Sequence, residues 1–216
     1  VYMVHNPIDQ FSIDTALYRL KFNEHFFLQL LKALNKKKIE SYQGKAYKEL
    51  GKYAIEIYKS LNFTLTNSQI KSLRDIRSDL KLKKPMNRLI QGDVGCGKTI
   101  VAVITAAIIV GHNSQVAIMA PTEILAEQHY ISFEKHFKNY DINCELLISN
   151  VNQKDKNKIY ENLQNGRIDI IVGTHALIQE KVNFKDLGLV IIDEQHRFGV
   201  DPVSYTHLRA HETMEY

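Results

Sequence analysis

The sequence predicts an α/β protein in which a central, mostly parallel sheet is flanked by helices and preceded by a helical segment. From about residue 66 onward, short apolar runs alternate with helical patterns. Such alternation is typical of βαβ units, whose parallel strands are covered on both faces. The 216 residues are 44% hydrophobic and 24% charged, as in globular proteins that bury a sizeable core. A glycine-rich loop joins one apolar run to a helix, as in sheets that bind ligands at the carboxyl ends of their strands.

The charge, the cysteine count and the length of the apolar runs exclude some classes of protein. The formal charge of +4, from 28 basic and 24 acidic residues, permits a nucleic-acid partner without requiring one. Cys96 and Cys144 are too few for a disulfide framework, which favours a reducing cytoplasm. The longest apolar run, residues 100–110, is too short to cross a bilayer, and no signal peptide opens the chain, so we expect no membrane partner. The chain starts at Val1 rather than Met, and we expect a piece of a longer protein.

Residues 1–62 are predicted to be helical. One apolar stripe has helical spacing and consists of Leu17, Leu20, Phe27, Leu31 and Leu34. Ser12 and Asp14 are candidate N-caps, lysines 36–38 are expected to end this helix, and residues 49–61 predict another. No nucleotide-binding or catalytic spacing occurs here, which favours a packing or linking role.

The later part of the chain supplies the sheet and its covering helices. Strands are expected at residues 88–91, 115–119, 143–148, 169–172 and 187–192, and helices at 98–110, 123–138 and 152–164.

A phosphate-binding loop follows the first predicted strand. Residues 92–99 match GxxxxGK[ST] in full and open the apolar helix at Ile100, the context that the motif needs. Backbone N–H groups and the helix N-terminus would surround phosphate oxygens, Lys98 would reach the β- and γ-phosphates, and Thr99 would bind Mg²⁺. The expected ATP-binding residues of the loop are Gly92, Asp93, Val94, Gly95, Cys96, Gly97, Lys98 and Thr99. Cys96 has a redox reading and a neutral one, and we favour the neutral one.

A second acidic site ends the strand predicted at residues 187–192. Asp193 would hold Mg²⁺, directly or through water, and Glu194 would orient or deprotonate the attacking water. Alone, an apolar run ending in Asp-Glu often marks a strand that enters a solvated loop. After a complete phosphate loop it predicts NTP hydrolysis, with Lys98, Asp193 and Glu194 as catalytic residues.

Several motifs together resemble those of the bacterial RecG family, ATP-dependent DNA helicases of superfamily 2. The resemblance extends over residues 1–200. It rests on the DExH-type segment 193–200, the loop 91–99, motif Ia at 120–129, motif Ib or Ic at 173–178, a Q motif at 63–66 with Gln69, and, before the motor, the segments 4–7 and 18–24.

The resemblance implies a RecA-like P-loop NTPase lobe at residues 63–200, with ATP and Mg²⁺ as cofactors and branched double-stranded DNA as the partner. Residues 1–62 would link this lobe to a DNA-binding wedge domain that the 216 residues do not contain. Gln69 would read the adenine edge and Phe63 would stack near the base.

Other site residues follow from the same resemblance. Thr122, Glu123, Thr174 and His175 would line a DNA-binding face and contact phosphates. Gln195 and His196 would couple hydrolysis to the DNA track. Thr174 and His175 have an alternative reading as a helix cap. His129 lies inside a predicted helix, and a structural role is expected for it.

The family pattern ends after Val200. Asp201-Pro202 departs from it, and residues 201–216 are expected to be a tail foreign to the family. The family's second motor lobe, which supplies arginine fingers, has no counterpart here, so we expect this chain to bind Mg-ATP with little turnover and no unwinding. Two alternatives remain: a translocase like the transcription-repair coupling factor, and an RNA-acting DExH ATPase. Primosomal helicase is a more distant third.

Overall fold

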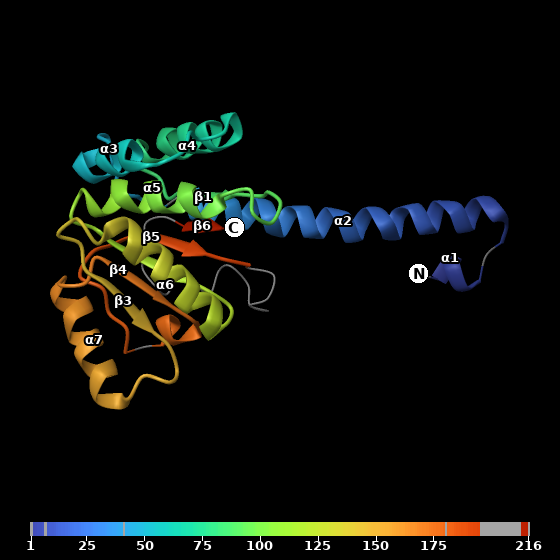
Figure 1. Cartoon of the computed structure of the whole chain (residues 1–216). Coiled ribbons are helices and arrows are strands. Elements are labelled where there is room, and N and C mark those ends of the chain that lie inside the picture. Colours follow the sequence, from blue (N-terminus) through green and yellow to red (C-terminus); the bar gives the residue numbers. More distant parts are fainter. Residues whose placement is uncertain (1, 7, 41, 180, 195–212, 216) are drawn as a thin grey trace. The chain divides into compact units, whose positions relative to one another are not determined.

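The structure is a computed structural model that describes residues 2–6, 8–40, 42–179, 181–194 and 213–215. The chain divides into two compact units, Val1–Tyr42 and Gln43–Tyr216. Figure 1 shows the elements of both units, which are considered separately below.

The N-terminal unit consists of α1 (Tyr2–His5) and the long helix α2 (Gln10–Glu40). The predicted helix is present, but it starts before both proposed caps, because Asp9 accepts hydrogen bonds from the backbone and hydroxyl of Ser12. The helix also continues past the lysines that were expected to end it. Every residue of the predicted apolar stripe is at least 37% exposed.

The second unit is built on a six-stranded sheet. Its strands are β1 (Asn87–Leu89), β2 (Gln115–Met119), β3 (Cys144–Leu147), β4 (Ile170–Gly173), β5 (Leu187–Ile192) and β6 (Thr213–Glu215). They lie in the order β1-β6-β5-β2-β4-β3, and every described pair is parallel. The predicted fold class is therefore confirmed. β6 comes from the segment that was expected to be foreign to the family.

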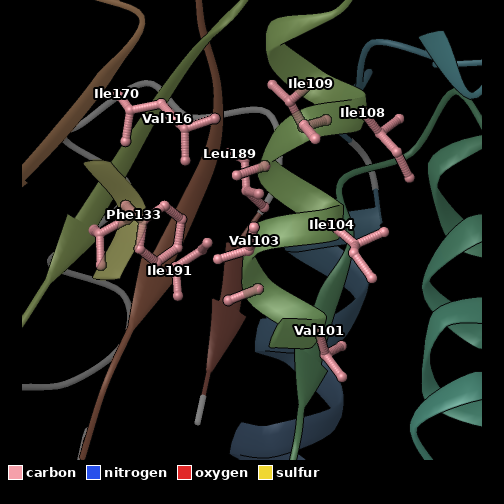
Figure 2. Packing of buried hydrophobic residues seen from close by; sticks show 14 of the residues in the cluster. Val101, Val103, Ile104, Ile108, Ile109, Val116, Phe133, Ile170, Leu189 and Ile191 are labelled. Carbon is pink, nitrogen blue, oxygen red and sulfur yellow. The ribbon is translucent and has the colours of Figure 1, made fainter. Parts of the chain in front are cut away.

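The two faces of the sheet are covered by different helices, as alternate strand residues require. The helices are α3 (Gly51–Ser60), α4 (Asn67–Leu80), α5 (Lys98–Val110), α6 (Glu123–Phe137), α7 (Gln153–Asn165) and the short 3₁₀ helix η1 (His175–Ile178). Ile118 and Ile191 share a core with α5 and α6, as Figure 2 shows for the cluster around Ile191, whereas Ala117 and Val190 pack with α7 and η1. Helices α3 and α4 pack outside α5 and join its core (Figure 1).

Helix α5 is buried throughout. Every residue from Ile100 to Val110 is buried, and Thr105, the polar member of this run, donates its hydroxyl to the carbonyl of Val101 at 2.7 Å. A helix that is apolar on all sides must lie inside the protein. The central position of α5, between the sheet and helices α3 and α4, meets this requirement and holds the loop that precedes it.

The predicted strands and helices of this unit are present, with end points shifted by up to two residues. α4 has no predicted counterpart because most of its residues are polar and its apolar positions are few. It starts with a capping box in which Thr66 and Gln69 each accept from the other's backbone N–H, at 3.3 and 2.9 Å. This reciprocal pair is the N-terminal signal.

Candidate functional site

The predicted site residues gather at the carboxyl edge of the sheet. Gly92 begins the loop that follows β1, Thr122 follows β2, Thr174 follows β4 and Asp193 follows β5. Backbone hydrogen bonds hold three of these strand ends together: Ala120 N–H donates to Gly173 O, and Asp193 N–H donates to Met119 O, both at 2.9 Å. Parallel strands place their carboxyl ends on one side, where α/β sheets bind ligands.

The loop 92–97 has the backbone of a phosphate cradle. Gly95 and Gly97 have φ angles of +80° and +82°, in the left-handed region that glycine adopts without steric cost. No heavy atom lies within 4 Å of the position that a Cβ would take at Gly95, while a Cβ at Gly97 would lie 2.4 Å from the Gln69 amide nitrogen. The loop is therefore open at Gly95 and closely packed at Gly97. Binding of a phosphate group there stays a prediction.

Lys98, the first residue of α5, lies across this loop. Its ammonium donates to the carbonyl oxygens of Gly92 and Asp93 at 2.8 and 3.0 Å, and lies 3.9 Å from the sulfur of Cys96. These partners are neutral carbonyls of an exposed loop. An anionic phosphate oxygen is a stronger acceptor for the same donors, so Lys98 is placed to bind one.

Gln69 connects α4 to the phosphate loop. Its side-chain amide donates to the carbonyls of Cys96 and Gly97 at 3.0 and 3.4 Å, while its oxygen accepts from Thr66 N–H. Both ends of this amide thus bind the protein, and contact with adenine stays a prediction. Phe63 is 54% exposed, and its stacking role stays a prediction too.

The acidic end of β5 makes a contact that the sequence analysis did not anticipate. The Nε2 of His129 lies 2.7 Å from Oδ2 of Asp193, and both side chains are mostly buried. Burial alone would raise the pKa of Asp193, but the His129 hydrogen bond, the charges of His129 and Lys98 and the backbone of Glu194 lower it overall. Asp193 is thereby kept ionised, as a metal ligand must be.

His129 is the residue that sequence reasoning missed. It was expected to be structural because it lies within a helix, but it reaches a carboxylate 64 residues away. No pattern along the chain signals this contact, because it joins α6 to the end of β5. Glu194, the other predicted catalytic carboxylate, adopts a left-handed φ of +49°, which is uncommon for a residue other than glycine.

The four predicted DNA-binding residues lie at the same edge of the sheet, and the side chains of two of them, Thr122 and Glu123, bond within the protein. Thr122 caps α6 by accepting from Leu125 N–H at 3.3 Å, and Glu123 binds the backbone of Ser149 and the side chain of Asn150 at 2.9 and 3.0 Å. Thr174 occupies the N-cap position of η1, as the alternative reading expected, but its side chain makes no capping hydrogen bond, and His175 is the first residue of η1. Gln195 and His196 lie outside the described residues. Contact with DNA stays a prediction for all four described residues.

The donor set fits a magnesium ion that is shared with a nucleotide. In the described part of the chain, no cluster of three or more His, Cys, Asp or Glu residues could hold a metal. Mg²⁺ commonly takes one or two protein ligands plus substrate phosphates, and the predicted pair, the Thr99 hydroxyl and the Asp193 carboxylate, has that chemistry. None of the helices described here is long and apolar enough to span a membrane.

Comparison with known families shows the family of this chain. The sequence model described as DEAD/DEAH box helicase matches residues 66–214, more than half of the chain. The chain belongs to the DEAD/DEAH box helicase family. A DEAD-box splicing factor of yeast, Prp28, has the same fold at a TM-score of 0.57 and 21% identity, over 74% of this chain and 42% of that one.

Within the DEAD/DEAH box helicases, the chain is similar to RecG. It is 48% identical over 199 residues to the ATP-dependent DNA helicase RecG of Thermotoga maritima and 46% identical over 201 residues to that of Bacillus subtilis. These alignments cover 92% of this chain but only 26% and 29% of the relatives. A structure of RecG bound to a three-way DNA junction matches 95% of this chain and 28% of its own, with 44% identity and a TM-score of 0.80. The predicted resemblance to RecG is confirmed.

Proposed function

We propose that this chain is the first motor lobe of an ATP-dependent DNA helicase that remodels branched DNA, such as stalled forks and Holliday junctions, in repair and recombination. The single observation that carries the proposal is the meeting of a complete phosphate loop and an ionised Asp193 at one edge of a parallel sheet, close enough for the Lys98 charge to lower the Asp193 pKa. The likeness to RecG supports DNA as the substrate and favours it over the coupling-factor and RNA-acting alternatives.

Different residues of the chain bind ATP, catalyse its hydrolysis and contact DNA. Lys98 and the loop N–H groups bind and orient the phosphates of ATP, and Thr99 and Asp193 hold Mg²⁺, which supplies positive charge for phosphoryl transfer. Glu194 orients the attacking water or accepts its proton. Gln69 and Phe63 recognise the base. Thr122, Glu123, Thr174 and His175 face the DNA backbone, and Gln195 and His196 relay the state of the ATP site.

The proposal extends to the rest of the protein. The chain spans about a quarter of the length of the RecG relatives that it matches. A second lobe and a wedge domain would complete the motor, residues 1–62 would link the lobe to the wedge, and residues 201–216 would be a tail foreign to RecG. The protein would act in the cytoplasm. The isolated chain is expected to bind Mg-ATP and hydrolyse it slowly, because no second lobe supplies an arginine finger.

The test compares ATP binding and turnover by this chain and by its Lys98→Ala variant, with and without forked DNA. The expected result is nucleotide binding by the wild type, weak or no turnover, and binding weakened about 10- to 100-fold in the variant. A longer protein that carries the same lobe should show turnover stimulated by branched DNA. Stimulation by RNA alone would favour the RNA-acting alternative, and binding unaffected by Lys98→Ala would contradict the proposed site.

A further inference from the structure

His129 lies on a helix that is held in place by its N-cap and by the core. It lies in α6, whose start is capped by Thr122 and whose later turns bury Phe133 and Phe137 in the core. Both rings stack on each other with centroids 6.2 Å apart. The helix therefore cannot rotate about its axis without exposing these rings, and the imidazole at position 129 stays directed at the end of β5.

The hydrogen bond from His129 fixes Oδ2 of Asp193, and Oδ1 takes no part in that hydrogen bond. The backbone of Asp193 is held by Met119 at 2.9 Å, and its Oδ2 by His129 Nε2 at 2.7 Å. An Asp side chain fixed at both points has little rotational freedom left at χ1 and χ2. Oδ1 then points in one direction only, as a single-oxygen metal ligand needs.

We propose that His129 is a positioning residue for magnesium: its Nε2–H holds the Asp193 carboxylate in the orientation that binds Mg²⁺ together with a nucleotide. This inference rests on the proposed function, since it assumes that the loop at residues 92–97 binds a nucleoside triphosphate. The imidazole does not itself bind the ion, because its Nε2 is used in the hydrogen bond to Asp193.

The burial of His129 and Asp193 makes it possible to distinguish a positioning role of His129 from a role in packing alone. The two side chains are 20% and 18% exposed, so solvent cannot readily replace the lost donor. Removing the N–H would leave a part-buried carboxylate with the Glu194 backbone contact but without the side chain that fixes Oδ2. A glutamine at position 129 can place its amide nitrogen near the position of Nε2, whereas an asparagine is too short and a phenylalanine keeps the ring without the donor.

The test measures how Mg²⁺ strengthens binding of a fluorescent, non-hydrolysable ATP analogue to the 216-residue chain. The wild type, His129→Phe, His129→Asn and His129→Gln are titrated with the analogue in EDTA and over a range of Mg²⁺ concentrations. His136→Phe is the matched control, because it makes the same change in the same helix, away from Asp193. Near-ultraviolet circular dichroism reports whether each variant is folded.

His129→Phe and His129→Asn should raise the Mg²⁺ concentration for half-maximal enhancement about 10-fold, as changes in residues that orient metal ligands commonly do. Binding in EDTA should be unchanged, His129→Gln should restore the midpoint to within about 3-fold, and His136→Phe should match the wild type. If His129→Phe does not fold, the contrast between the asparagine and glutamine variants gives the answer.

Two results would overturn the inference. A Mg²⁺ midpoint in the folded phenylalanine or asparagine variant within about 2-fold of the wild type would show that the contact does not position the ligand. Equal loss in the glutamine variant would show that an N–H donor near the position of Nε2 does not set the Mg²⁺ midpoint. Failure of the wild type to bind the analogue at all, or equal binding by Lys98→Ala, would instead contradict the proposed function.

Discussion

Both edges of the sheet have polar side chains that hydrogen-bond to residues far away in the sequence. The two edges differ in whether a ligand could replace the partners of those hydrogen bonds. At the carboxyl edge, Lys98 and Gln69 bind backbone carbonyls of an exposed loop. At the amino edge, Gln115 is 4% exposed; its amide donates to the carbonyls of Leu163 and Ile168, and its oxygen accepts from two backbone N–H groups. A ligand can displace the first kind of partner but not the second.

The same amino edge also has a charged cluster that could be mistaken for a site. Lys45 bonds Asp186 at 2.5 Å and Ser114 at 2.8 Å, and Ser114 donates to Asp186 at 2.8 Å. All three are partnered with one another, and Ser114 is buried. The difference teaches that the residue types present do not distinguish a binding edge from a structural one, whereas the exchangeability of their partners does.

The largest expected effect is a difference in the rate of alkylation between the two cysteines, one of which lies at each edge. Burial, reinforced by Asp169, Glu134 and Glu145, raises the pKa of Cys144 from 9.0 to about 12. At pH 8 its thiolate fraction is then on the order of 10⁻⁴, so iodoacetamide should label the exposed Cys96 and leave Cys144 unmodified. Mass spectrometry of the labelled protein measures this, and ATP should slow labelling at Cys96 only.

The Cys144 pKa also predicts the direction of a pH effect on stability. The folded state favours the protonated thiol, so its contribution is complete below pH 9.0 and is lost as the pH rises toward about 12. Rapid labelling of Cys144 at pH 8 in the folded protein would contradict the burial on which this rests. Labelling in urea, where both cysteines should react, is the control.

Gln115→Leu should destabilise the protein by about 3 kcal/mol, because it removes four hydrogen bonds in a place that water cannot reach. Urea denaturation followed by circular dichroism gives the value. Gln69→Leu, at the exposed edge, should cost about 1 kcal/mol or less. Equal costs for the two glutamines would break the proposed distinction between the edges.

Lys98→Ala should weaken nucleotide binding about 10- to 100-fold, the range expected when a charge-assisted hydrogen bond to phosphate is lost. Its stability should change little, because the partners of Lys98 are carbonyls of an exposed loop. Titration with a fluorescent nucleotide measures the affinity. Lys45→Ala removes a lysine from the opposite edge, and a comparable loss of affinity in that variant would indicate unfolding rather than a binding role.

The smallest effect is expected for Lys45→Met. The ion pair with Asp186 is short, but its side chains are 40% and 38% exposed, so it should contribute roughly 0.5–1 kcal/mol to stability. The difference should shrink further in 0.5 M salt, because exposed charges are screened. A loss that is large and independent of salt would mean that the pair organises the segment before α3.

Much of the fold could be predicted from periodicity because the buried strands are short and apolar. Residues 115–119 and 187–192 form strands with the predicted bounds, and residues 98–110 form the predicted helix. α4 was missed because its sequence is mostly polar and its capping box is a short signal. Periodicity shows which residues face the core, but a polar helix on the outside of another helix leaves little such pattern.

The parts of the candidate site that lie within a single sequence motif could be predicted from the sequence. The loop at 92–99 and Asp193 each have a local signature, and parallel pairing places them at one edge. The contact between His129 and Asp193 has none, since it depends on the rotation of α6 and on the β2–β5 register. Gln115, which begins a strand, likewise has no local pattern that reveals its four partners.

The burial of α5 determines how slowly its backbone amide hydrogens exchange with solvent. The phosphate loop is continuous with a helix whose residues from Ile100 to Val110 are all inside the protein. Amide hydrogens of such a helix exchange with solvent through global unfolding, whereas those of the exposed loop before it exchange through local opening. Nucleotide binding should therefore slow exchange by orders of magnitude in the loop, while α5 itself, already at the protein's slowest limit, can change only as the whole molecule does.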